Sequence, residues 1–345
     1  MNSTDESKKL ALRNPPIIGY LHHAHKLSIA SVIEGFDTWL LNYFIQLKCH
    51  TDLSTNRHRQ LDFYHDSHNP DNLLQIDAFD GLLWIDFFAG KELVQHYKDG
   101  MVDFLIDQLN MNKYVEFTVD EFFIPGTSFY KKFTMGHQIL VHGYDLNKKT
   151  FNIATFIQEQ FTIDAEISFH ELLEAFQNAP WFFCFLIRIP DEPIKPVMDI
   201  TKICNTIENY LAGRRSANDE SRQGQDTSVY GIRIYECVTA YVDCLINRKT
   251  HYDVRPLHLL WEHKKLMKMR IEAMEAADLL NPEQGVTVRY TEVESLVRIS
   301  RALLMKYQIT KGINLLDKIK VNLKKTLELE TELLTEVLDM IKRSR

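Results

Sequence analysis

The stretch GHQILVHGYDLNKKTFNIATF, residues 136–156, decides the fold of the first half of the chain. Both of its ends are rich in β-branched and aromatic residues, and the central DLNKK is a turn signal. We therefore expect two antiparallel strands, over Gln138 to Tyr144 and Thr150 to Phe156. Similar stretches at Tyr114 to Phe123 and Phe182 to Ile189 extend this pair into an antiparallel sheet.

Helical patterns accompany the predicted sheet. Apolar residues from Ile29 to Leu47 recur at three- and four-residue steps, which predicts one core helix beginning near Ser28. A second helical pattern runs from about Lys91 to Leu109. Ser168, followed three residues later by Glu171, forms a capping box that opens a short helix.

Beyond residue 200 the periodicity is almost entirely helical. Each predicted helix carries its own apolar stripe, so the simplest outcome is a bundle. Thr291 with Glu294 predicts a second capping box. The predicted helices are Val229 to Ile246, Pro256 to Leu280, Thr291 to Ile309 and Ile313 to Ile341.

The resulting fold class is α+β, with a sheet domain followed by an all-α bundle. We expect a flexible N-terminus over residues 1–15, a first domain over 16–198 and a helical domain over 199–345. The polar stretch of residues 213–228 has no aliphatic residue larger than alanine until Val229, which predicts a mobile loop.

Composition narrows the function classes. The chain has 345 residues, 45% hydrophobic and 25% charged, with a net charge of -7, which fits a globular protein and argues against nucleic acid as a partner. Its five cysteines form no CxxC pair, which disfavours a disulfide framework or a cysteine zinc site. With no signal peptide and no long apolar run, we expect a cytoplasmic protein with no membrane partner.

Histidines gather just before the first predicted helix, in the segment Tyr20-Leu21-His22-His23-Ala24-His25. Three imidazoles this close offer metal ligands, but they also occur as hydrogen-bonded or exposed side chains. Neither an HExxH motif nor a facing carboxylate motif accompanies them, so we expect no metal. Tyr20, His23 and His25 remain candidates for substrate binding.

His137 stands at the start of a predicted strand, beside Gly136. Alternation places His137 and Ile139 on one face of the strand, and Gln138 and Leu140 on the other. Two interpretations remain open from these residues: a histidine satisfied at a sheet edge, and a histidine that opens onto a cleft.

The segments FFIP (122–125), GHQILVHGYD (136–145) and FNIATF (151–156) together resemble papain-like proteins related to bacteriocin-leader peptidases and butirosin-type acyltransferases. Such proteins accompany nonribosomal peptide and polyketide antibiotic pathways. The resemblance implies a cysteine at the N-terminus of the first helix, a histidine that starts a strand, and an acid or amide on the next strand. It implies thiol attack on an acyl group, with no cofactor.

Carried over residue by residue, the resemblance makes His137 the catalytic histidine and puts His22 where the cysteine belongs. The acid position falls at about Ala154 or Thr155, so the usual carboxylate is also absent. Cys49, at the far end of the predicted first helix, and Cys184, within an apolar strand, are poor substitutes for the nucleophile. Candidates for the cleft wall and for substrate binding, besides the histidine segment, are Trp39, Asp120 and Tyr144. Asp120 and Glu121 lie beside the cleft strand and either supply a carboxylate or are exposed acids at a strand end.

A mixed basic and aromatic stretch lies in the helical half, from Arg255 to Lys265. It either docks an acidic carrier-protein helix or a phosphopantetheine phosphate, or forms a buried polar seam between helices.

Two functions follow from this sequence. The first is acyl-transfer or amide-bond chemistry, of the acyltransferase, peptidase or cyclase type, on an acyl or peptidyl chain held by a carrier protein, with His137 and His22 as the reacting groups. The second is a catalytically inactive papain-like protein that recognises a small-molecule or peptidyl intermediate, or its carrier.

Overall fold

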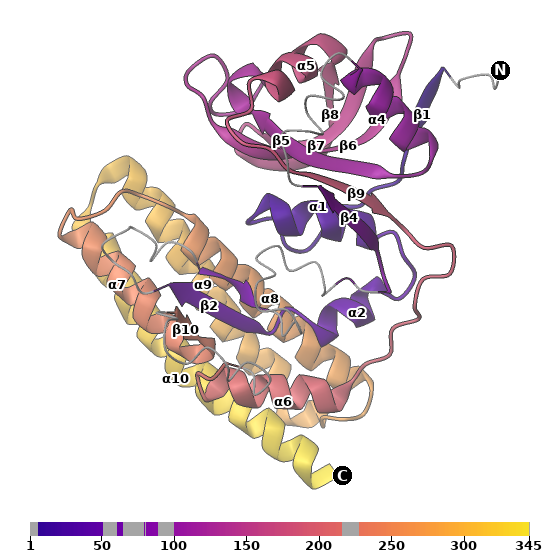
Figure 1. Cartoon of the computed structure of the whole chain (residues 1–345). Coiled ribbons are helices and arrows are strands. Elements are labelled where there is room, and N and C mark those ends of the chain that lie inside the picture. The colour runs from indigo at the N-terminus through magenta and orange to yellow at the C-terminus, as the bar shows by residue number, and fades with distance from the viewer. Residues whose placement is uncertain are drawn as a thin grey trace. The chain divides into compact units, whose positions relative to one another are not determined.

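The computed structural model describes residues 6–50, 61–64, 79, 81–88, 100–215 and 228–344. Its architecture is α+β, with antiparallel sheets and helices towards the N-terminus and long packed helices towards the C-terminus (Figure 1). The chain divides into two compact units. Unit 1 comprises Met1–Phe36 and Phe79–Lys195, and unit 2 comprises Asp37–Ala78 and Pro196–Arg345.

Unit 1 is built on an antiparallel sheet with the strand order β4-β9-β5-β6-β7-β8, and β1 pairs with β6. The described helices of this unit are α1 (Leu21–Ala30), α4 (Met101–Asn110) and α5 (Phe169–Gln177). The strands are β1 (Ser7–Lys9), β4 (Trp84–Phe88), β5 (Tyr114–Asp120), β6 (Gly136–Asp145), β7 (Thr150–Ile157), β8 (Gln160–Ser168) and β9 (Cys184–Arg188).

The predicted antiparallel sheet is confirmed, as is the alternation along β6. Alternate residues Val115, Phe117 and Val119 of β5 join a hydrophobic core together with Ile139 and Val141 of β6. Residues of α4 and α5 belong to the same core, so these two helices cover one face of the sheet. The other face of β5 carries Glu116, and α1 packs there.

The predicted long helix from Ser28 to Leu47 is wrong. The segment forms α1, then α2 (Phe36–Asn42), then strand β2 (Gln46–His50). Gly35, with φ of +82°, takes a left-handed conformation that a continuous helix cannot accommodate. Ser28 therefore lies inside α1, where its hydroxyl donates to the carbonyl of Ala24 at 2.7 Å, and it is not an N-cap.

The other local predictions concern two capping boxes, the N-terminus and the helix expected from Lys91, and their outcomes differ. The Ser168–Glu171 capping box is present at the start of α5. Thr291 is not a cap, because its helix begins earlier, and its hydroxyl donates to the carbonyl of Thr287. The expected flexible N-terminus is wrong for Ser7–Lys9, which find backbone partners along the edge of β6. The N-terminal part of the predicted helix from Lys91 lies outside the described residues, and α4 begins at Met101.

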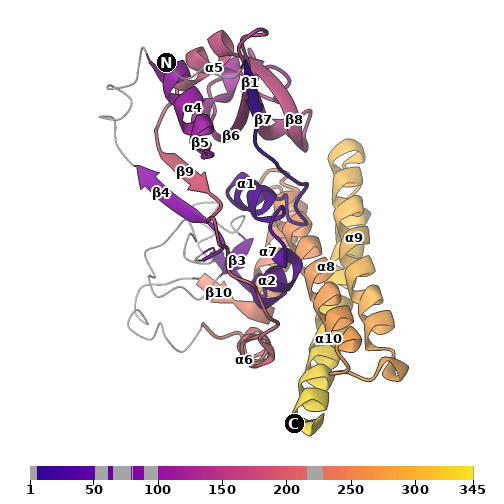
Figure 2. The same cartoon turned by 90° about the vertical axis from the view of Figure 1, so that its right-hand side faces the viewer.

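Unit 2 consists mainly of long helices. In both views α8, α9 and α10 lie side by side (Figure 1 and Figure 2). Four helices of this unit match the predicted ranges with shifted ends, whereas α6 and α2 were not predicted. The helices beyond residue 196 are α6 (Ile200–Leu211), α7 (Ile234–Ile246), α8 (Arg255–Ala276), α9 (Val286–Thr310) and α10 (Ile313–Ser344).

A small antiparallel sheet, of order β10-β2-β3, completes unit 2. It joins β2 to β3 (Leu61–Tyr64) and β10 (Ser228–Tyr230). Cys49 lies in β2, so its predicted place at the end of a helix is wrong, although it is buried. The expected domain boundary at residue 198 lies close to Pro196, but the excursion Asp37–Ala78 into unit 2 has no counterpart in the prediction.

Two further predictions concern the polar loop before Val229 and the absence of a membrane-spanning helix. Most of the predicted mobile loop over 213–228 lies outside the described residues. Among the described residues, no helix combines the length and the apolar character needed to cross a lipid bilayer.

Candidate functional site

The start of β6 is held by a turn that the sequence encodes at Asp120. The Asp120 carboxylate accepts hydrogen bonds from the backbone N–H of Phe122 at 3.0 Å and of Met135 at 2.9 Å. One side chain therefore fixes both the end of β5 and the approach to β6. Asp120 was predicted as a binding residue, and its observed contacts are those of a positioning residue.

This turn places Glu121 against His137. The Nδ1 atom of His137 lies 2.5 Å from Oε1 of Glu121, and the side chains are 40% and 6% exposed respectively. A carboxylate accepts only, so Nδ1 carries the proton and, in the neutral ring, Nε2 carries the lone pair. Among the described residues, Nε2 makes no hydrogen bond. The pair is thus a half-exposed base oriented by a buried acid.

Glu121 takes the place of the carboxylate that the resemblance led us to seek on β7. There, Ala154 and Thr155 are buried and bear no acid. The orienting acid comes instead from the short 3-10 helix Glu121–Phe123, directly after β5. The sequence held a signal for it, because two acids stand side by side where the strand ends.

An exposed aromatic surface borders the start of β6. A Cβ atom added at Gly136 would meet Nε1 of Trp181 at 2.5 Å, so only glycine fits below that indole. Trp181 is 46% exposed and its ring lies 5.2 Å from that of Phe183. Phe87, on edge strand β4, is also exposed and lies 6.4 Å from Phe183. Together these three rings, Trp181, Phe183 and Phe87, form what we call the aromatic wall.

A second polar group lies on the opposite face of the sheet, where α1 packs. Lys26 donates to Glu116 at 3.0 Å, and Nδ1 of His25 lies 3.3 Å from the other carboxylate oxygen. All three side chains are buried. Nε2 of His25 donates to the carbonyl of Ala154 at 3.0 Å. Lys26 also lies over the ring of Phe185, 4.5 Å from its centroid.

Burial and charge act against each other within this group. Burial would raise the pKa of Glu116, but the charge of Lys26 and the proximity of His25 outweigh it and lower that pKa to about 2. Burial lowers the pKa of His25, opposed by Glu116 and assisted by the charges of Lys26 and His137. Glu116 is therefore ionised, and His25 is neutral over most of the physiological pH range.

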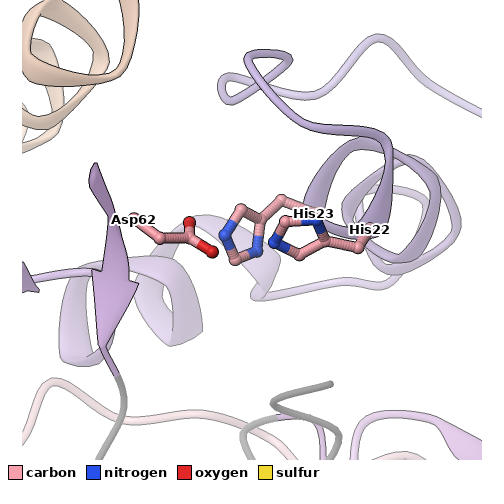
Figure 3. A group of neighbouring side chains, drawn as sticks. All are labelled: His22, His23 and Asp62. Carbon is pink, nitrogen blue, oxygen red and sulfur yellow. The ribbon is translucent and has the colours of Figure 1, made fainter. Parts of the chain in front are cut away.

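His22 and His23 lie in the first turn of α1. Their rings are 4.1 Å apart and tilted, and the His22 ring stacks on that of Tyr20 at 5.3 Å (Figure 3). Asp62, drawn with them, is a residue of unit 2. His23 is buried and His22 is partly exposed.

The strand register pairs His137 with Val119 of β5, whereas His22 and His25 belong to α1. The charge of His137 acts on His25, and its hydrogen-bond contact is with Glu121.

The two remaining candidates, Tyr144 and Trp39, are buried. Tyr144, at the far end of β6, is buried in the core and donates to the side chain of Asn110 at 2.8 Å. Trp39 is buried in α2 and belongs to unit 2. Both have the contacts of packing residues.

In the stretch from Arg255 to Lys265, the expected polar seam is present along one side of α8. Glu262, His263 and Lys264 are buried, and Lys264 donates to both oxygens of Glu330 on α10 at 2.7 Å. Nε2 of His263 donates to the carbonyl of Ile45 at 2.7 Å. These groups are satisfied inside unit 2.

Comparison with known proteins adds no identity. No protein-family model matches the chain, and no curated protein matches it.

Proposed function

We propose that this protein carries out acyl-transfer or amide-bond chemistry on a carrier-bound acyl or peptidyl intermediate, with His137 as the general base. The observation that carries the proposal is the pair formed by His137 and Glu121, in which a buried carboxylate orients a half-exposed imidazole. A base held in one tautomer by an acid is the arrangement that proton transfer from a nucleophile needs.

The proposed step uses a nucleophile that belongs to the substrate. An amine or hydroxyl attacks the carbonyl of an acyl thioester while Nε2 of His137 removes its proton. The new C–N or C–O bond forms, the C–S bond breaks, and the imidazolium returns the proton to the leaving thiolate. Glu121 stabilises the imidazolium in between. No cysteine of the chain takes part in this step, and the step does not use His22.

The aromatic wall supports an acyl or peptidyl substrate. Trp181 lies against Gly136, one residue from His137, and its indole is half exposed. Flat apolar rings of this kind bind an alkyl or aryl chain by burying its surface.

A second candidate function is recognition of the same intermediate without turnover. One observation favours it: no cysteine, serine or threonine of the described residues makes a hydrogen bond to His137. Under either function, we propose a reducing compartment, the cytoplasm, because the five cysteines are thiols and not disulfides.

Turnover of simple thioesters separates these functions. Hexanoyl and benzoyl thioesters of N-acetylcysteamine, with glycinamide as acceptor, are incubated with the protein, and thiol release is followed with a disulfide dye. We expect His137→Gln to lower kcat by about 100- to 10,000-fold, the usual contribution of a general base. His170→Gln, a change to an exposed histidine of α5, is the matched control and should keep the wild-type rate.

Two results would overturn the enzymatic proposal. One is an unchanged rate in His137→Gln. The other is saturable binding of the thioesters with no thiol release by the wild-type protein, which establishes the recognition function in its place.

A further inference from the structure

One face of α9 is exposed and combines apolar with basic residues. Arg298, Ala302, Met305 and Ile309 follow one another at steps of three and four residues, and Arg301 lies three residues after Arg298 and four before Met305, which places all five along one side of the helix. Met305 is 43% exposed and Ile309 is 84% exposed. We call these five residues the α9 stripe. Methionine and isoleucine this accessible on a rigid helix mark a surface that another molecule covers.

The residues around the α9 stripe carry a net positive charge, whereas the whole chain carries a net negative charge. Residues 298–320 contain six lysines and arginines and a single carboxylate, Asp317, which gives a local charge of +5 in a chain of net charge -7. Such a concentration of one sign attracts an oppositely charged partner and raises its rate of encounter.

Two hydrogen-bond donors next to the stripe have no acceptor. Nε1 of Trp261 on α8 and Nε of Arg301 on α9 are both inaccessible atoms without a hydrogen-bond partner among the described residues. The guanidinium of Arg301 lies over the indole, 5.6 Å from its centroid, so the two donors belong to one place. The Arg301 guanidinium is thus held in place by the Trp261 ring beside the stripe.

We propose that the α9 stripe and Trp261 dock an acidic amphipathic helix of a partner protein. The stripe is 12 residues long, from Arg298 to Ile309, and extends for about 17 Å, or three turns, so it matches a helix of similar length. The partner's apolar residues pack on Met305 and Ile309, and its carboxylates pair with the cationic side chains of Arg298 and Arg301.

This inference goes beyond the proposed reaction and does not depend on it. A carrier protein displaying such a helix would deliver its acyl chain through this surface, and only that extension rests on the proposed function.

Peptide binding tests the docking surface. The probe is a fluorescein-labelled 18-residue helical peptide with leucines at steps of three and four and glutamates elsewhere, followed by fluorescence anisotropy with the full chain. We expect Met305→Asp to raise Kd at least about tenfold and Arg301→Gln by about three- to tenfold. Val288→Asp is the matched control, since Val288 is also exposed on the same helix but lies nearly six turns from Ile309.

The controls make the result decisive. Equal binding of a scrambled glutamate-leucine peptide, or an equal loss in Val288→Asp, would overturn the proposal. Co-sedimentation with phosphatidylglycerol vesicles that Met305→Asp abolishes, without any peptide binding, would assign the surface to lipid and overturn it too. His137→Gln should leave the Kd of the peptide unchanged, so failure of the reaction and failure of docking are distinguishable.

Discussion

Each unit buries a lysine–glutamate pair beside a histidine, and the two networks differ in how completely their atoms are satisfied. In unit 2, Glu330 accepts from Lys264 and from the hydroxyls of Tyr290 at 2.7 Å, Tyr235 at 2.8 Å and Tyr210 at 3.1 Å. In unit 1, Glu116 accepts from Lys26 through one oxygen only.

The other half of the unit 1 network is unsatisfied. Nδ1 of His25 and Oε1 of Glu116 lie 3.3 Å apart, but neither atom has a hydrogen-bond partner. Because Nε2 of His25 donates to Ala154, a neutral ring turns its Nδ1 lone pair towards a carboxylate oxygen. Two acceptors face each other there. Two equally buried ion pairs therefore differ in how much they stabilise the protein, because the number of hydrogen-bond donors around each carboxylate differs.

The largest expected effect on stability comes from breaking the unit 2 network, in which Glu330 accepts from Lys264 and three tyrosine hydroxyls. Glu330→Gln leaves Lys264 without a counter-charge in a fully buried place, and we expect it to lower the free energy of unfolding by about 4 kcal/mol. Urea denaturation, with hydrogen exchange resolved on α10 peptides, measures the loss. Glu332→Gln, at an exposed position two residues along α10, is the control and should change stability little. A loss as small as that of the control would mean that the network does not stabilise unit 2.

Acid should weaken unit 1 through Glu116. Its folded pKa of about 2 lies below the ordinary 4.5, so the unfolded chain takes up a proton first, and stability is full above pH 4.5 and lost as pH falls towards 2. The whole effect is about 3 kcal/mol by the conversion of pKa into free energy. His25 acts in a separate window, because its lowered pKa removes stability as pH falls below 6.5.

Urea midpoints between pH 5 and pH 2 test this effect. The decline should be smaller in Glu116→Gln than in the wild type, while Glu159→Gln, at an exposed turn, should decline as the wild type does. Parallel curves for Glu116→Gln and the wild type would show that Glu116 is not held ionised by its neighbours.

These networks also show how far the sequence could predict the molecule. The strands around Ile139 were predictable because their alternation is local, and the helices beyond residue 230 because each has its own apolar stripe. The break at Gly35 was not, since the apolar steps continue across it in the sequence while the backbone turns.

The candidate site was partly predictable because some of its residues follow from local sequence patterns. His137 followed from its place at the start of a strand, and Asp120 and Glu121 stood where the neighbouring strand ends. Which of these two acids faces the histidine depends on the turn that Asp120 closes with Met135, fifteen residues away. The partners of Lys26 and Lys264 lie 90 and 66 residues away, and no local pattern pairs them.

The smallest expected effect comes from a double variant that removes both charges of a buried lysine–glutamate pair. Making such a double variant in each unit compares the two networks most directly. Replacing a buried ion pair by apolar residues of similar volume is often neutral, provided that no other polar group loses its partner. In Lys26→Met with Glu116→Leu, the carboxylate facing Nδ1 of His25 is removed, and His25 keeps its hydrogen bond to Ala154. We expect the free energy of unfolding to stay within about 1 kcal/mol of the wild type.

In Lys264→Met with Glu330→Leu, three buried tyrosine hydroxyls lose their acceptor, at a cost of about 1 kcal/mol each. The unit 2 double variant should therefore be less stable than the unit 1 double variant by about 2 kcal/mol, measured by urea denaturation of both proteins. Equal losses would show that the tyrosines find other partners, so that the two networks differ in their number of donors but not in what those donors contribute.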